Sequence, residues 1–271
     1  MDILEKIVAD KKLEVEHRKA ALPLAQLKER IDRTGIGRTL SLKASLQQGG
    51  YGIISEFKRR SPSKGWINEG ARASVVPLSY QKSGAAAISI LTDGKYFGGS
   101  DAFVHEARQS GVTMPVLYKN FIIDKYQLYE AKMCGSSAVL LIAACLSEEL
   151  CGRYIELAHR LGMEVLLEVH SERELPYLRL NPDMCGVNNR NLGTFETDVE
   201  NSFRLAEKLP RHICRISESG ISDPHTVARL VTAGYTGFLI GETFMKTADP
   251  GLSLRRYISE IDMILKERVA K

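Results

Sequence analysis

A carboxylate and a lysine two residues apart, Glu56 and Lys58, are the side chains of this chain best placed to do chemistry. Glu56 lies at the end of the short run 52–57, and Lys58 follows that run and begins a basic loop rich in Ser, Pro and Gly. On a β-strand, side chains two apart point to the same face, so we expect both to project from the end of one strand. A buried strand has no structural use for two opposite charges unless they do chemistry or bind something charged. The sequence therefore predicts that a polar site begins here.

Eight short β-rich runs recur from Tyr51 onward, and charged segments long enough for one helix each separate them, for instance 151–161 and 223–233. The predicted strands are 52–57, 86–91, 115–118, 138–142, 164–168, 184–188, 213–217 and 237–241. Each is apolar nearly throughout, which is typical of a parallel sheet buried on both faces. Glycines precede five of these runs, where a helix ends and the chain turns into the next strand. They are Gly84, Gly111, Gly135, Gly162 and Gly234.

This alternation predicts an α/β TIM (β/α)8 barrel in one domain, 1–271, with residues 1–46 as an N-terminal helical extension. The apolar residues of 3–8 lie on one helical face, which must dock and is expected on the barrel rim near the site. A doubly wound open sheet is the alternative. It usually has only about five to seven strands and often carries a GxGxxG fingerprint after its first strand. A lysine-rich loop occupies that position here, which favours the barrel.

In a barrel of this kind, chemistry takes place at the carboxyl ends of the strands. The polar residues at those ends are Glu56, Lys58, Thr92, Asp93, Lys119, Glu168, Asn188, Arg190, Glu218 and Glu242. Two lysines, several acids and an arginine around one mouth are hard to explain by packing and predict a catalytic site. The structural alternatives are an ion pair of Glu56 and Lys58 at the rim and a surface position for Lys119. His170, two residues beyond Glu168, is not assigned to the site.

Glycines also end the last two predicted strands, in Ser217-Glu218-Ser219-Gly220 and Gly241-Glu242. Phosphate sites in barrels are often built from these two loops, with backbone N–H groups facing the anion. Gly220 and Gly241 would let the backbone approach closely, and Ser219 would add a hydroxyl group. A single glycine here could serve turn geometry alone, but the paired positions predict a phosphate site.

The composition is that of an ordinary globular protein, with 44% hydrophobic and 26% charged residues. The net charge of +4 suits an anionic small molecule and is far from the basic stripe of a nucleic-acid binder. The N-terminal residues mix charges with apolar side chains, and the longest apolar run, 138–146, is too short to span a bilayer. The five cysteines are scattered without a CxxC pair and are interpreted as reduced. These features predict a cytoplasmic protein.

The loop after the first strand belongs to a long motif, Ser55-Glu56-Phe57-Lys58-Arg59-Arg60-Ser61-Pro62-Ser63-Lys64-Gly65. Further motifs follow in order along the chain: Leu91-Thr92-Asp93, Leu117-Tyr118-Lys119, Leu167-Glu168-Val169-His170, Asn188-Asn189-Arg190 and Ser217-Glu218-Ser219-Gly220-Ile221. Together they resemble the indole-3-glycerol phosphate synthase family over nearly the whole chain.

The resemblance implies conversion of 1-(2-carboxyphenylamino)-1-deoxyribulose 5-phosphate into indole-3-glycerol phosphate, carbon dioxide and water. The aromatic carbon that bears the carboxylate must attack the ribulose carbonyl, whose oxygen gains negative charge and needs a general acid. Carbon dioxide then leaves, and a hydroxyl group is eliminated with help from an acid and a base. No step needs a redox cofactor or a metal, so neither is expected.

By the same resemblance, Lys119 is the acid of ring closure and Glu168 is the base of dehydration. Lys58 binds the substrate carboxylate and is a candidate second acid, and Glu56 orients the lysines and the substrate amine. The remaining residues are assigned to substrate binding (Ser61, Asn188, Arg190 and Glu218) and to the phosphate (Ser219, Gly220, Gly241 and the backbone of Glu242).

Three residues depart from the family pattern. Tyr118 stands where relatives often carry Arg or Cys. Asn120 stands where many relatives have an aspartate after the catalytic lysine, and without that carboxylate the pKa of Lys119 is expected to fall or its side chain to be freer. Trp66, in the loop after the first strand, is open to two interpretations. It covers the anthranilate ring, or it packs the loop.

Two other functions fit a phosphate-binding barrel. The isomerase one step earlier in the pathway typically relies on a Cys–Asp pair, with the cysteine where this chain has Glu56-Phe57-Lys58. A non-catalytic sensor or scaffold should have lost an acid or a base, whereas every expected one is present. The predicted partner is therefore a small phosphorylated substrate, with no nucleic acid and no membrane, and the chain is expected to be a monomer or a weak homodimer.

Overall fold

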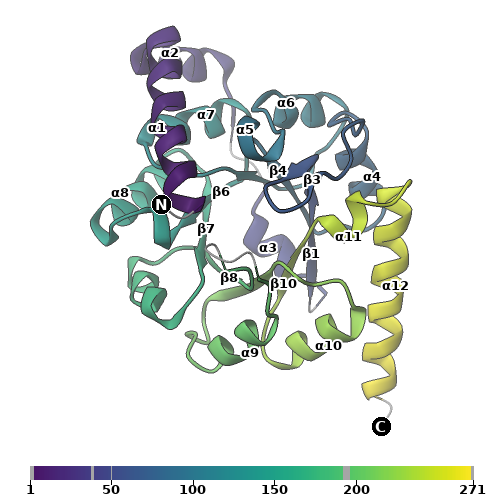
Figure 1. Cartoon of the computed structure of the whole chain (residues 1–271). Coiled ribbons are helices and arrows are strands. Elements are labelled where there is room, and N and C mark those ends of the chain that lie inside the picture. The colour runs from purple at the N-terminus through teal and green to yellow at the C-terminus, as the bar shows by residue number, and fades with distance from the viewer. Residues whose placement is uncertain (1–2, 38–39, 50, 192–195, 270–271) are drawn as a thin grey trace.

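The computed structural model describes residues 3–37, 40–49, 51–191 and 196–269; the rest of the predicted range 1–271 lies outside the described residues. Eight parallel strands close into a barrel, ringed by helices (Figure 1). They are β1 (Gly52–Phe57), β4 (Ala87–Leu91), β5 (Val116–Lys119), β6 (Ala138–Ile142), β7 (Glu164–Val169), β8 (Met184–Asn188), β9 (Cys214–Glu218) and β10 (Gly237–Ile240). The predicted (β/α)8 barrel is confirmed, and each strand ends within one residue of its predicted bounds.

Helices follow the strands as the charged segments predict. They are α1 (Ile3–Ala21), α2 (Leu24–Thr34), α3 (Leu42–Gln47), α4 (Val76–Lys82), α5 (Gly94–Phe97), α6 (Ala102–Gln109), α7 (Lys125–Met133), α8 (Glu148–Arg160), α9 (Glu200–Ala206), α10 (Pro224–Thr232), α11 (Glu242–Met245) and α12 (Pro250–Val269), with 3-10 segments η1 (Ala143–Cys145) and η2 (Glu172–Leu180). The side chains of Asp124, Ser147 and Asp223 cap α7, α8 and α10 by accepting backbone N–H groups. Among the described helices, none combines the length and apolar character needed to cross a membrane.

The five glycines predicted to end helices all have positive φ, between 74° and 102°. This left-handed conformation costs glycine little and lets each helix stop and turn toward the next strand. The prediction that these five glycines end helices is therefore confirmed.

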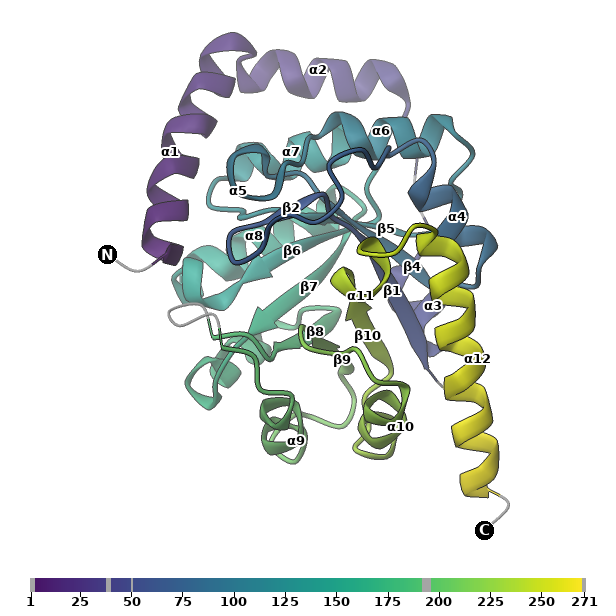
Figure 2. The ribbon, with the colours of Figure 1, turned by 45° about the vertical axis from the view of Figure 1, so that its right-hand side comes forward.

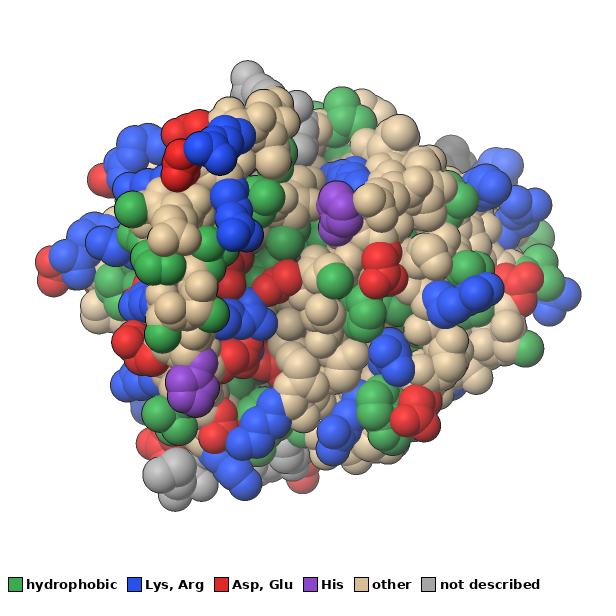
Figure 3. All heavy atoms as spheres, turned by 90° about the horizontal axis from the view of Figure 1, so that it is seen from above, with side chains coloured by type: hydrophobic (Ala, Val, Ile, Leu, Met, Phe, Trp, Pro, Cys, Tyr) green, Lys and Arg blue, Asp and Glu red, His purple; other side chains and the backbone are tan. Residues whose placement is uncertain are grey.

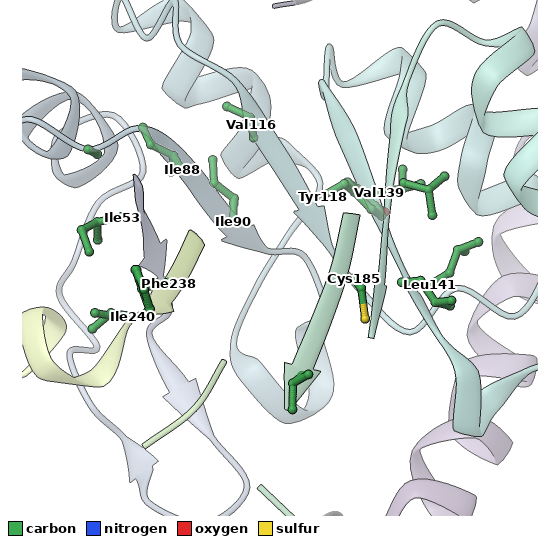
Figure 4. Close-up of a cluster of buried hydrophobic side chains, with 14 of the residues drawn as sticks. Ile53, Ile88, Ile90, Val116, Tyr118, Val139, Leu141, Cys185, Phe238 and Ile240 are labelled. Carbon is green, nitrogen blue, oxygen red and sulfur yellow. The ribbon is translucent and has the colours of Figure 1, made fainter. Parts of the chain in front are cut away.

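Two apolar layers hold the barrel together. Side chains that point outward from the strands, such as Ile53, Ile90 and Val116, pack under the helices (Figure 4). Their neighbours one residue away, such as Ile54 and Leu117, point inward and form a separate interior cluster. Because side chains alternate along a strand, each strand must be apolar on both faces, which is why periodicity of two is missing from the sequence.

Helix α3 closes the barrel at the amino ends of its strands. Leu42 and Leu46 are fully buried within the interior cluster. A side-chain methyl group at Gly52 would lie 2.8 Å from Leu46 Cδ2, and one at Gly237 would lie 3.1 Å from Leu46 Cδ1. The carboxylate of Glu164 holds the start of α3 by accepting the backbone N–H of Lys43 at 2.9 Å. Helix α3 therefore fits into the end of the barrel only because residues 52 and 237, which face Leu46, are glycines.

Replacing Leu46 by alanine should lower the free energy of unfolding by about 2–5 kcal/mol, because the surrounding strands cannot move far enough to fill the cavity that the smaller side chain leaves. Urea denaturation followed by circular dichroism measures this loss. Leu13→Ala is the matched control, since Leu13 is 64% exposed and its truncation should change stability by at most about 0.5 kcal/mol. Equal effects of the two substitutions would show that α3 does not hold the barrel shut.

The N-terminal extension packs beside the barrel (Figure 2). Helices α1 and α2 both lie against α7, where Val15 of α1 and Leu27 and Ile31 of α2 pack with Tyr126. Ion pairs fix α1 to the barrel: Lys11 lies 2.7 Å from Asp93 with both side chains buried. Asp93, a candidate from the sequence, therefore braces α1 and also caps α5.

The loop after β1 contains a short antiparallel hairpin that the sequence did not predict. Its strands are β2 (Arg60–Ser61) and β3 (Gly65–Trp66), joined through Pro62-Ser63-Lys64. Each of these strands has only two residues, which is too few for a strand pattern to be recognised in the sequence.

Candidate active site

A cavity of about 610 Å³ opens at the carboxyl ends of the barrel strands, lined by residues of all eight strands, of loops that follow them and of α1. Every residue assigned to the site from the sequence lines it. These are Glu56, Lys58, Ser61, Lys119, Glu168, Asn188, Arg190, Glu218, Ser219, Gly220, Gly241 and Glu242. Side chains from distant parts of the chain thus share one space, as the barrel topology requires.

Lys119 lies between two glutamates. Its Nζ is 3.1 Å from Glu168 Oε2 and 2.7 Å from Glu218 Oε2. Burial alone would lower the pKa of Lys119, but the carboxylates of Glu218 and Glu168 outweigh it and raise this pKa above its ordinary value. Lys119 is consequently protonated at neutral pH and able to donate.

The lower pKa that Asn120 suggested for Lys119 is not found. The Asn120 amide donates to Thr92 Oγ1 at 2.7 Å and to the Tyr118 hydroxyl at 3.4 Å, and its carbonyl accepts the N–H of Phe121. Its side chain thus braces neighbouring strands, and the charge state of Lys119 is set by Glu168 and Glu218 instead.

Glu168 is an ionised carboxylate with three polar neighbours. Burial would raise its pKa, but Lys119 and His170 outweigh burial and hold the pKa well below its usual range. Asn188 Nδ2 donates to Glu168 Oε1 at 3.0 Å, and His170 Nε2 lies 3.2 Å from the same oxygen. His170, left out of the predicted site, therefore contacts one of its central residues.

Glu218 is fully buried and has the opposite tendency. Burial raises its pKa to about 7, and the nearby Glu168 charge adds to this effect against the pull of Lys119. Among the described residues, no group donates a hydrogen bond to Glu218 Oε1. Two carboxylates on either side of Lys119 thus differ in proton affinity, which is the arrangement expected of an acid–base site.

Two glycines, one inside β8 and one directly after β10, make room for carboxylates. A methyl group at Gly186 would lie 2.0 Å from Glu218 Oε1, and one at Gly241 would lie 2.5 Å from Glu56 Oε1. The sequence predicts Gly241 as part of a phosphate loop. The structure adds a second reason for glycine at this position, because a side chain there would clash with the Glu56 carboxylate.

Glu56 and Lys58 form an ion pair, with 2.7 Å between Oε1 and Nζ, at the side of the cavity formed by β1. Glu56 is buried and Lys58 partly exposed. The cavity wall therefore contains four ammonium groups, of Lys58, Lys64, Lys119 and Lys246, and four carboxylates, of Glu56, Glu168, Glu218 and Glu242. Within the described ranges, no group of three or more His, Cys, Asp or Glu side chains is arranged to hold a metal ion.

The hairpin after β1 reaches over the cavity and is tied to the opposite loop. Arg190 Nη1 donates to Ser63 Oγ at 2.8 Å, and the buried Ser61 accepts the N–H of Lys64 at 3.2 Å. Trp66 is 47% exposed, lies beside the guanidinium groups of Arg59 and Arg60, and is not among the described cavity residues. Of its two interpretations, packing the loop agrees with the structure.

The loop after β9 has an unusual backbone. Ser219 and Gly220 both have positive φ, 69° and 73°, and the Ser219 conformation costs a non-glycine residue about 1–3 kcal/mol. The buried Asn189 holds the loop by donating to the Ser219 carbonyl at 3.0 Å and to Ser217 Oγ at 3.1 Å. The loop after β10 leads directly into α11. Both loops border the cavity, as a phosphate site between them requires.

Apolar side chains that the sequence did not assign to the site also line the cavity. They are Ile3, Leu4 and Ile7 of α1, together with Leu91, Phe97, Phe121, Leu140, Ile142, Ile221, Leu239 and Ile240. The expectation that the apolar face of α1 docks near the site is confirmed. The cavity thus offers an aromatic ring an apolar wall beside its charged groups.

Comparisons with known proteins show which family the chain belongs to. The sequence profile of the family described as indole-3-glycerol phosphate synthase matches residues 4–257. The indole-3-glycerol phosphate synthase of Bacteroides thetaiotaomicron is 55% identical over 96% of this chain and 99% of its own length. Those of Magnetococcus marinus (43% identical over 95% of this chain and 98% of its own) and Polynucleobacter asymbioticus (39% over 93% and 97%) are also similar.

Among solved structures, 3-hexulose-6-phosphate synthase from Salmonella typhimurium superposes with a TM-score of 0.61, covering 79% of this chain and 99% of that one at 15% identity. KGPDC from Streptococcus mutans gives the same TM-score, covering 79% and 98%, at 9% identity. At such identities the likeness shows the barrel fold alone. The family profile and the relatives over nearly full length decide the question: the chain belongs to the indole-3-glycerol phosphate synthase family.

Proposed function

We propose that this chain performs the family's ring closure with Lys119 as the acid and Glu168 as the base of the later dehydration. As a member of the family, the enzyme is a carboxy-lyase of tryptophan biosynthesis. The observation that carries the assignment is the pair itself, since a protonated amine and an ionised carboxylate lie 3.1 Å apart in one buried cavity. A general acid and a general base within reach of one bound substrate are what the chemistry requires.

Lys119 acts in the first step. As the aromatic carbon attacks the ribulose carbonyl and the new C–C bond forms, the carbonyl oxygen takes a proton from Lys119 and becomes a hydroxyl group. The bond to the carboxylate then breaks, carbon dioxide leaves, and its electron pair returns to the ring. Glu218 lies 2.7 Å from Lys119, so the raised pKa of this carboxyl group makes it a suitable neighbour to share the proton.

Glu168 acts in the last step. It removes a proton from the intermediate while the hydroxyl group leaves as water, protonated by a second acid, for which Lys58 is the candidate. The new double bond completes the indole ring. Asn188 fixes the Glu168 carboxylate, and Glu56 fixes Lys58.

The two anionic groups of the substrate, its carboxylate and its phosphate, are assigned to two separate groups of residues. Lys58 binds the carboxylate, with Ser61 and Arg190 beside the hairpin that covers it. The phosphate lies against Ser219 and the backbone N–H groups of Gly220, Gly241 and Glu242. Support comes from the cavity that joins both groups and from the apolar wall available to the anthranilate ring.

The same proposal takes residues 1–271 as one domain with 1–46 as its helical extension, working in the cytoplasm as a monomer or weak homodimer. The five cysteines are all free, in keeping with a reducing compartment. On the face drawn in Figure 3, basic and acidic side chains are interspersed, which suits a small-molecule enzyme better than a nucleic-acid binder.

Replacing Lys58 by glutamine tests the substrate assignment. Purified wild-type protein should convert the carboxyphenylamino-deoxyribulose phosphate with a rise in indole fluorescence. Loss of carboxylate binding should raise KM about 10–100-fold, because a charge-assisted hydrogen bond contributes about 1.5–3 kcal/mol. A fall in kcat in addition is the result expected from the candidate role of Lys58 as the second acid. Lys95→Gln is the matched control, since Lys95 also pairs with a carboxylate, Asp10, but outside the cavity.

Absence of turnover by the wild type would contradict the function itself. An unchanged KM in Lys58→Gln, with the control also unchanged, would contradict only the role given to Lys58.

A further inference from the structure

His170 lies behind the proposed base and outside the residues described as lining the cavity. Its Nε2 is 3.2 Å from Glu168 Oε1, and its Nδ1 is 3.6 Å from Glu174 Oε2. The imidazole ring thus stands between two carboxylates, with 14% of its side chain exposed. Both separations are within ion-pair range, although neither ring nitrogen makes a hydrogen bond among the described residues, so the ring attracts both carboxylates only as an imidazolium.

The position of His170 is fixed by three elements. The strand that precedes it, β7, supplies Glu168. The following segment, η2, supplies Glu174, which also accepts the backbone N–H of His170 and completes the capping box with Ser171. Helix α9 supplies no charge here, because the Asn201 amide donates to the His170 carbonyl at 3.0 Å. Glu168 and Glu174 are the charged groups described as facing the ring.

Acidic and basic side chains alternate in a series of contacts that leads into the cavity. Glu174 is followed by His170, then by Glu168, and then by Lys119, each within 3.6 Å of the next. Burial alone would lower the pKa of His170, but Glu168 and Glu174 outweigh it and raise this pKa to about 10. The carboxylate of Glu168 consequently has one cation outside the described cavity, His170, and one inside it, Lys119.

We infer that His170 is a positioning residue for Glu168, an imidazolium that orients this carboxylate and keeps it ionised when the substrate draws the charge of Lys119 away. The inference rests on the proposed role of Glu168 as the base of dehydration. Once Lys119 gives up its proton, the cavity loses the cation that lowers the pKa of Glu168. His170, with Glu174 behind it, retains its charge through that step and leaves Glu168 able to accept a proton afterwards.

The pH dependence of kcat tests this inference with the variant His170→Gln. Glutamine keeps a hydrogen-bond donor but removes the charge, so the pKa of Glu168 should rise. A base works only when deprotonated, so the acidic limb of the kcat–pH profile should move to higher pH, by about one unit or more. His225→Gln is the matched control, since this exposed histidine lies outside the cavity, and its profile should match the wild type.

Three results would overturn the inference. One is a fall in kcat by the same factor at every pH with the acidic limb in place, which is what a merely structural role predicts. Another is an unchanged profile. The third needs no variant: nitrogen-15 NMR of the wild-type histidines at about pH 8 should show one imidazolium, and neutral spectra for all six would exclude the charged state. If Glu168→Gln itself keeps full turnover, the proposed function has failed and not only this inference.

Discussion

Lys119→Ala is expected to lower kcat by about 10²–10⁴-fold while KM changes little. A general acid contributes this much when it protonates an oxygen whose charge develops only in the transition state. Lys119 is the cation that both Glu168 and Glu218 hold inside the cavity, so its loss removes the proton and its positioning together. Steady-state fluorescence measurements of indole formation give kcat and KM directly.

Two further variants separate acid chemistry from charge and from folding. Lys119→Arg keeps the positive charge but not a transferable proton, because guanidinium is not deprotonated in proteins, so it should fold and remain almost inactive. Lys132→Ala removes a buried lysine that donates to the Gly37 carbonyl and does not line the described cavity, so kcat should be retained. Substantial turnover by Lys119→Arg would contradict the role of Lys119 as the acid and leave it a purely electrostatic one.

The barrel and the residues around its mouth could be predicted because both depend on local patterns. Apolar runs of strand length, each preceded by charged helical segments and often by glycine, determine the order of elements. The topology then brings every strand end to one rim. Glu56, Lys119 and Glu168 were therefore predictable as neighbours although more than a hundred residues separate the first and last of them in the sequence.

The finer contacts depend on which atoms meet across the barrel, and no local pattern contains that information. Lys119 contacts Glu218, 99 residues away, and the glycine at 186 is explained only by the Glu218 carboxylate that fills its place. His170 lies one residue beyond the end of β7, where strand alternation no longer predicts the direction of a side chain. The fit of α3 into the barrel likewise depends on Gly52 and Gly237 lying on either side of Leu46.

Glu168→Gln is expected to lower kcat by about 10²–10⁴-fold through a different step. Glutamine is nearly the same size as glutamate and still accepts from Asn188, but it cannot remove a proton, so dehydration should stop. Ring closure and decarboxylation precede that step in the proposed order. A single turnover should therefore release carbon dioxide without the indole fluorescence that follows it in the wild type.

The release of carbon dioxide distinguishes the two variants, since Lys119→Ala should yield neither product in a single turnover. Glu130→Gln is the matched control for Glu168→Gln, because Glu130 is also a largely buried carboxylate with a basic partner, Arg18, but lies outside the described cavity. Its loss should leave both products forming together. Indole and carbon dioxide lost in parallel in Glu168→Gln would place Glu168 in or before ring closure, and the alternating charges of Lys119, Glu168 and His170 would then serve the first step of the reaction and not the last.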